Sequence, residues 1–75
     1  MDIETAFGTV IRTLRYGKGW SQEKLAVESK VDRNYISLIE LGRNSPSIKT
    51  IFRLCGALGI SVAECMAQVE NLIPD

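Results

Sequence analysis

One face of a short predicted helix carries the side chains best suited to recognise another molecule. Arg33 and Asn34 follow a helix-capping Asp32, and Ser37 and Leu38 come one turn later, opposite the apolar residues of the same stretch. Arginine pairs with the edge of guanine and asparagine with that of adenine, while a leucine offers an apolar contact to the thymine methyl group. Serine can bind a base or a phosphate. These residue types favour binding to double-stranded nucleic acid.

Two helices joined by a tight turn must position that face. Ser21 and Asp32 are each placed to accept an unpaired backbone N–H at the start of a helix. The helix that Asp32 begins runs to about Leu41. Apolar residues flank each cap at the positions of a hydrophobic staple, which fixes the direction in which the chain enters the helix. These staples pair Trp20 with Leu25 and Val31 with Ile36. The apolar residues expected to face the core are Leu25, Ala26, Val31, Ile36 and Ile39.

Three further stretches have the apolar spacing of helices. Residues 3–16 predict one helix, weakened by Gly8 by up to about 1 kcal/mol and ended by glycines at 17 and 19. Ser47 caps another, which Gly59 ends, and Ser61 with Glu64 forms a capping box for the last, over 61–72. The predicted core positions are Ile3, Phe7, Val10, Ile11 and Leu14, then Ile48, Ile51, Phe52, Cys55 and Leu58, then Val62, Cys65, Met66, Val69, Leu72 and Ile73. We predict one compact all-α domain of five helices over residues 1–75.

The charge is unevenly distributed, although the net charge of the 75 residues is zero. All nine basic residues lie between Arg12 and Arg53, together with four acidic residues, so this window carries +5. The acidic remainder lies in the two ends of the chain. A basic window that coincides with the two-helix unit favours an anionic partner over an ordinary solvated surface.

Composition argues against several classes of function. The chain has no histidine, no glycine-rich phosphate loop and no metal-ligand spacing, so we expect no cofactor, no metal and no enzyme activity. Cys55 and Cys65 fall on apolar stripes and are predicted to be buried free thiols. No apolar run reaches membrane-spanning length and no leader is visible, so we expect a cytoplasmic protein without a membrane or small-molecule partner.

The run SQEKLAVESKVDRNYISLIELGRNSPSIKTIFRLCGALGISVAEC resembles the Cro and phage-repressor (XRE-type) helix-turn-helix family. The matching features are the Ser-Gln opening, Ala26, the apolar positions of both helices, and Ile-Glu-x-Gly followed by Pro-Ser. The similarity extends from Arg15 to about Met66 and places the motif at about residues 21–41. Within this family, the short length of the chain and its Asp-Arg-x-Tyr-Ile-Ser run make it most similar to the controller proteins of restriction-modification systems.

The resemblance implies roles for individual residues. The implied base contacts are Arg33, Asn34, Ser37 and Leu38. Gln22, at the N-terminus of the first motif helix, is placed to bind a phosphate. Tyr35 has two interpretations, a hydroxyl on a phosphate or a ring packed over the first motif helix. The other implied phosphate contacts are Arg43, Asn44, Ser47 and Lys49.

Two features of the resemblance, an ion pair and a turn residue, concern structure. Arg15 and Glu40 match a family ion pair that braces the first helix against the second motif helix, which starts at Arg33 and is called the recognition helix. Arg12 is interpreted as a solvated charge. Lys30 stands at the turn where the family usually has a glycine in a left-handed conformation. That conformation costs a non-glycine residue about 1–2 kcal/mol. We expect the turn to survive because apolar staples hold both sides of it.

The expected mechanism is that of a homodimeric transcription regulator on an inverted-repeat operator, possible targets being restriction-modification genes. A two-fold dimer places two recognition helices about 34 Å apart on the duplex. The candidate interface residues are Met66, Val69, Leu72 and Ile73 of the last helix, which can also serve the core of one chain. One alternative is an antitoxin-like interaction protein whose main partner is another protein. The other, an enzyme, would need activity that depends on Glu64 or Glu70.

Overall fold

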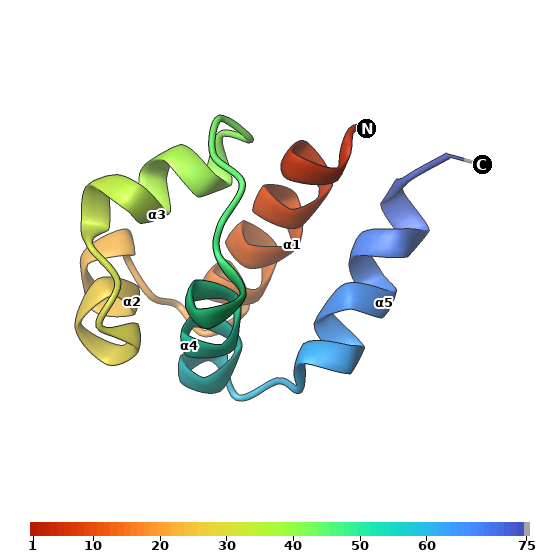
Figure 1. Cartoon of the computed structure of the whole chain (residues 1–75). Helices are drawn as coiled ribbons and strands as arrows, with labels where there is room; N and C mark the ends of the chain where they lie inside the picture. The colour runs from red at the N-terminus through yellow and green to blue at the C-terminus, as the bar shows by residue number, and fades with distance from the viewer. Residues whose placement is uncertain (75) are drawn as a thin grey trace.

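The computed structural model describes residues 1–74 and contains five α-helices joined by short loops. They are α1 (Ile3–Gly17), α2 (Gln22–Ser29), α3 (Arg33–Glu40), α4 (Ile48–Leu58) and α5 (Val62–Leu72). α1 runs through the middle of the molecule and contacts α3, α4 and α5, so that α2 and α3 lie on one side of it and α5 on the other (Figure 1). The predicted all-α fold is confirmed, with helix boundaries within two residues of those expected.

Each helix begins at a side chain that accepts a backbone N–H. The predicted caps Ser21, Asp32, Ser47 and Ser61 are confirmed, and Asp2 caps α1 in the same way. The N–H groups donate to these oxygens over 2.8–3.3 Å. A cap of this kind stabilises a helix by about 1 kcal/mol, which is a large contribution for helices of only eight residues such as α2 and α3.

The core draws apolar side chains from all five helices. Its fully buried members include Ile11, Leu25, Ile36, Ile39 and Leu54, and both cysteines are buried free thiols as predicted. The apolar positions of the motif are therefore confirmed as core positions, with Ala26 half-buried at the edge. The remaining half-buried residues against the core are Leu14, Trp20, Tyr35, Ile51, Ala57, Ile60, Val62, Met66, Leu72 and Ile73.

Three residues predicted to face the core are exposed, so that part of the prediction was wrong. Ile3 is 62% exposed, Ile48 75% and Phe52 60%. α4 turns Leu54 and Leu58 fully toward the core, and Ile48 and Phe52, four residues apart, form an adjacent ridge on the helix surface. We call Ile48 and Phe52 the α4 ridge. Apolar surface that stays in water is a reason to look for a partner.

No single helix in residues 1–74 combines the length and the apolar composition needed to cross a bilayer. α4 and α5 meet that requirement only when taken together, and the chain bends by 103° between them. The whole molecule measures 35 × 22 × 22 Å.

Candidate nucleic-acid interface

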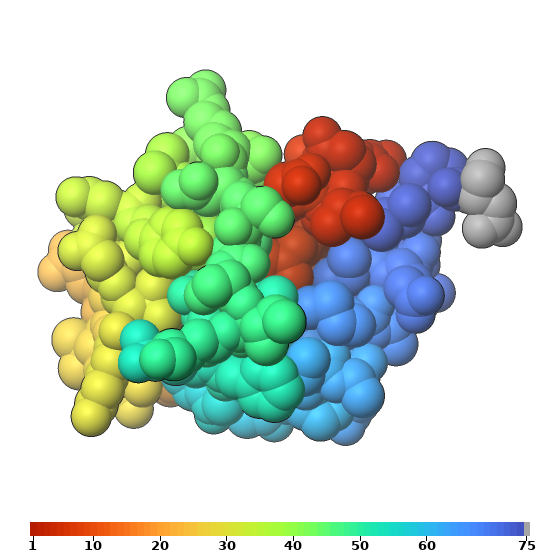
Figure 2. All heavy atoms as spheres, in the orientation of Figure 1, coloured from red at the N-terminus to blue at the C-terminus, as the bar shows by residue number. Residues whose placement is uncertain are grey.

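α3 presents a polar face to solvent because its opposite face is fixed in the core. Ile36 and Ile39 are fully buried, and the Asp32 carboxylate accepts the N–H groups of Asn34 at 2.9 Å and Tyr35 at 3.3 Å. The residues predicted to contact bases all lie on this helix, with Arg33, Asn34 and Leu38 exposed and Ser37 half-buried. α2 and α3 form the orange to yellow-green side of the molecular surface (Figure 2).

The turn before α3 keeps the family geometry without a glycine. Lys30 adopts the left-handed conformation, with φ 59° and ψ 31°, and its N–H donates to the carbonyl oxygen of Ala26 at 2.9 Å. The buried Ser29 hydroxyl donates to the Leu25 carbonyl at 2.6 Å and accepts the Val31 N–H at 3.3 Å. The expected survival of the turn is confirmed, since these bonds offset the strain at Lys30.

A buried ion pair sets the position of α3 against α1. Nε and Nη2 of Arg15 donate to the two carboxylate oxygens of Glu40, each over 2.8 Å. The two side chains are only 8% and 3% exposed, and the hydrogen bonds to Glu40 raise the pKa of Arg15. Gln22 Nε2 donates to the same carboxylate at 3.1 Å, and Arg15 Nη1 donates to the Trp20 carbonyl at 2.9 Å. This brace thus joins α1, the start of α2 and the end of α3.

Gly8 allows the close contact between α1 and α3 that the brace requires. A methyl group on Gly8 would overlap the carbonyl oxygen of Ile39 and lie 2.9 Å from that of Glu40. From the sequence, this glycine is only a weak point in a helix. Its structural role depends on α3, because no larger residue fits between the backbones of α1 and α3.

The interpretation of Arg12 as a solvated charge was wrong. Its Nη2 donates to the backbone carbonyl of Glu40 over 2.9 Å, and the side chain is half-buried. That carbonyl belongs to the last residue of α3, where carbonyl groups lack a partner within the helix. Arg12 therefore caps the C-terminal end of the recognition helix from α1.

The residues predicted to contact phosphates occupy different surroundings. Arg43 and Lys49 are exposed and Asn44 is half-buried. Ser47 uses its hydroxyl to cap α4, where it accepts the Thr50 N–H at 3.2 Å. The predicted contacts on the motif helices are Gln22, which donates to Glu40, and Tyr35, whose half-buried ring packs against the core.

Arg33 makes only a loose, exposed ion pair. Its Nε lies 4.0 Å from a carboxylate oxygen of Glu23, and the two side chains are 56% and 79% exposed. An exposed pair at this distance contributes about 0–1 kcal/mol, so it leaves the guanidinium available to a stronger acceptor. A guanine edge, which offers two acceptors, meets that description.

Residues 1–74 contain no cluster of three or more histidine, cysteine, aspartate or glutamate side chains able to hold a metal. The buried carboxylate, Glu40, is already occupied by Arg15 and Gln22. Burial raises the pKa of Cys65 to about 12 and also raises that of Cys55, which keeps both thiols protonated at neutral pH. Neither buried thiol is therefore activated as a nucleophile.

Residues 11–65 match the helix-turn-helix family. The chain belongs to this family. It is 34% identical over 71 residues to the control protein C.MunI of a Mycoplasma species, in a match covering 93% of this chain and 96% of that protein. The resemblance to controller proteins is therefore confirmed, and the wider relatives are transcription regulators.

Solved structures show the same fold across nearly the whole chain. The clp gene regulator ClgR from Corynebacterium glutamicum superposes with a TM-score of 0.90 at 31% identity, covering 99% of this chain and 96% of that chain. The restriction-modification controller protein C.Esp1396I, solved as a tetramer with its natural 35 base-pair operator, gives a TM-score of 0.86 at 30% identity. That match covers 95% of this chain and 93% of the other.

This helix-turn-helix protein has a second, apolar surface on α4 and α5. A cavity of about 90 Å³ lies between α1 and these helices, and its lining includes Ile3, Ile51 and Met66. The α4 ridge of Ile48 and Phe52 is on the same helix as Ile51. Sequence reasoning missed this surface because helical spacing places the ridge residues on the apolar stripe, and only the packed helix shows which edge of the stripe stays exposed.

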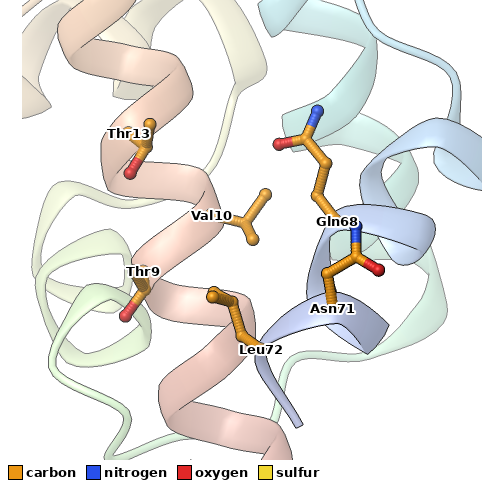
Figure 3. A pocket seen from close by; sticks show the side chains of 6 residues that line it. All are labelled: Thr9, Val10, Thr13, Gln68, Asn71 and Leu72. Atoms are coloured by element: carbon orange, nitrogen blue, oxygen red, sulfur yellow. The ribbon is translucent and has the colours of Figure 1, made fainter.

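The residues predicted for dimerisation are not on one surface. Val69 is 4% exposed and lies in the core of a single chain, whereas Met66 and Leu72 lie on opposite flanks of α5. Figure 3 shows Leu72 pointing toward α1 beside Thr9 and Val10, where it lines a cavity of about 250 Å³. Ile73 is half-buried at the end of α5. Among these four predicted interface residues, Met66 is the one that borders the apolar surface on α4.

Proposed function

We propose that the protein is a sequence-specific DNA-binding transcription regulator that acts in the cytoplasm as a homodimer on an inverted repeat. The observation that carries this proposal is the exposed polar face of α3, which is held by a buried ion pair at one end and a carboxylate cap at the other. The relatives support it, since they are transcription regulators and one of the similar structures contains operator DNA.

The outer face of α3 reads the bases in this proposal. Arg33 and Asn34, in the first turn of the helix, pair with guanine and adenine, Leu38 contacts a thymine methyl group, and Ser37 binds a base or a neighbouring phosphate. Phosphates on either side position the helix. The proposed phosphate contacts are Gln22, Tyr35, Arg43, Asn44, Ser47 and Lys49.

A second copy of the chain is the proposed occupant of the apolar surface on α4 and α5. The α4 ridge and Met66 form its centre, and Ile73 lies half-buried at the end of α5, whereas Leu72 lies on the other flank of α5 beside α1. One helix in one groove contacts few base pairs, so two copies related by a two-fold axis bind more tightly and more selectively. For a dimer that neutralises about 6–10 phosphates, affinity falls steeply as salt increases.

Selection from random duplex DNA tests this function, with the parent protein compared with Arg33→Ala. We expect the parent to enrich an inverted repeat and the variant to lose its preference at one base pair in each half-site, because each good arginine contact discriminates by about 1–3 kcal/mol. Arg53→Ala is the control, since Arg53 is an exposed arginine of α4 that is not among the proposed base or phosphate contacts. It should enrich the same repeat as the parent. Promoters that contain the enriched sequence then identify the genes that the protein regulates.

If the parent protein enriches no sequence at moderate salt, the proposed function is wrong. If both arginine variants select the same operator as the parent, the protein reads DNA but Arg33 does not contact a base.

A further inference from the structure

A polar hollow of about 240 Å³ opens between α1, α2 and α3, beside the outer face of the recognition helix. Arg12 and Tyr16 of α1, Gln22 of α2 and Ser37 of α3 line it, and the Arg15–Glu40 ion pair forms part of its wall. A water molecule takes up about 30 Å³ of liquid, so the hollow admits a much larger polar group. We call it the α1–α3 hollow.

Positive charge exceeds negative charge in the α1–α3 hollow. Arg15 neutralises Glu40 through two hydrogen bonds. Arg12 lines the same hollow, and among residues 1–74 its partner is the backbone carbonyl of Glu40, with no carboxylate within 4.0 Å. A half-buried guanidinium without a matching carboxylate favours an anion beside it.

Hydrogen-bond donors remain for that anion. Arginine has five N–H groups and Arg12 uses one of them, while Gln22 uses one of the two on its amide nitrogen. Tyr16 is 66% exposed, and the Arg15 guanidinium lies 4.7 Å from the centre of its ring. That contact places the ring beside the hollow that Tyr16 lines, and its phenol hydroxyl can donate a hydrogen bond.

We propose that the α1–α3 hollow binds one phosphodiester of the DNA backbone in each half-site, with Arg12 and Tyr16 as its contacts from α1 beside Gln22. This inference rests on the proposed function. It adds α1 to the DNA-binding surface. It also gives the brace a second role, since Arg15 and Glu40 orient Tyr16 and Gln22 toward the same phosphate.

The test replaces single phosphates of the selected operator by methylphosphonate, which removes the negative charge at one position. We expect one position in each half-site at which this change weakens binding of the parent about tenfold, has a smaller effect on Tyr16→Phe, and has little further effect on Arg12→Gln. Tyr16→Phe keeps the ring beside Arg15 and removes the hydroxyl. Arg12→Gln keeps a donor for the Glu40 carbonyl and removes the charge, which should reduce the salt slope by about two for a dimer.

Arg53→Gln removes the same charge from α4, outside the hollow, and should respond to every methylphosphonate as the parent does. Chemical unfolding establishes that each variant is folded, and Tyr16→Phe carries the test alone if Arg12→Gln is not. If both hollow variants respond like the parent at all positions, the hollow holds no phosphate. If the parent binds no duplex at all, the proposed function fails first and this inference with it.

Discussion

The contact between α1 and α3 and the contact between α4 and α5 are built from opposite kinds of chemistry. The first is polar, with the buried Arg15–Glu40 ion pair and the close approach at Gly8. The second is apolar, with Cys55 and Cys65 buried and the α4 ridge left exposed beside them. Figure 1 shows that α3 and α5 lie on opposite sides of α1.

The difference suits the two sides of the molecule to different tasks, the orientation of α3 on one side and association with a second copy on the other. Hydrogen bonds have direction, so the polar brace fixes the angle of α3, and base readout depends on that angle. Apolar contact has no direction and grows with buried area, which suits association with a second copy. Changes to the polar contact should therefore alter folding and readout, while changes to the α4 ridge should alter association.

The largest effect is expected from Arg15→Ala, which leaves Glu40 buried without its counter-charge. We expect it to lower the free energy of unfolding by about 3–5 kcal/mol in a urea titration. The matched control is Lys24→Ala, which removes an exposed pair with Glu28 at 3.2 Å and should cost less than about 0.5 kcal/mol. Equal stability of Arg15→Ala and the parent would show that the brace does not hold the fold.

The double substitution Ile48→Ser with Phe52→Ser should disrupt the apolar surface on α4. We expect the dimer dissociation constant to rise about a hundredfold in sedimentation equilibrium, because both apolar side chains lose their burial in the partner. The unfolding of the monomer should change little. Val27→Ser is the control, since Val27 is 72% exposed on α2 and should leave the dimer intact. A dimer that survives the double change places its interface elsewhere.

Gly8→Ala should separate α1 from α3 without changing any charge. We expect a loss of about 1–3 kcal/mol of unfolding free energy, since the new methyl group forces the two backbones apart. Gly56→Ala on α4 is the internal control, because a methyl group there meets nothing within 4 Å. It should stabilise the protein by about 0.5–1 kcal/mol through helix propensity. Thermal melts of the two variants should shift in opposite directions.

The smallest expected effect concerns alkaline pH and the α4–α5 contact. The Cys65 thiol stays protonated in the folded chain up to a pKa of about 12, but in the unfolded chain it ionises near its ordinary value of 9.0. Unfolding therefore releases a proton above pH 9, and the stability associated with the buried thiol is present below that pH and lost as pH rises. Relative to Cys65→Ala, the parent should lose about 1.4 kcal/mol between pH 9.5 and 10.5. A pH-independent difference would contradict the burial of a protonated thiol.

Local signals in the sequence predicted most of the fold. Ser21, Asp32, Ser47 and Ser61 marked four helix starts because a cap acts within three residues of itself. The resemblance to a known family added the Arg15–Glu40 pair, whose members are too far apart in the sequence for local rules to join them.

The remaining features depend on how helices pack, which local patterns do not report. Ile48 and Phe52 have the same spacing as core residues, and only the rotation of α4 in the packed domain leaves them in water. Arg12 acquires its partner from the last residue of α3, and the α1–α3 hollow draws its lining from three helices. The site residues on α3 could be proposed from the sequence, whereas the contacts from α1 could not.

The most direct measurement of the link between the two sides is the affinity for operators with altered half-site spacing. If the apolar surface joins two copies so that both α3 helices face one side of the duplex, inserting five base pairs between half-sites rotates one of them to the far side. We expect such an insertion to weaken binding of the parent at least about a hundredfold, and to have no effect on the Ile48→Ser, Phe52→Ser variant. Equal affinity of the parent for both spacings would contradict a dimer that positions two recognition helices.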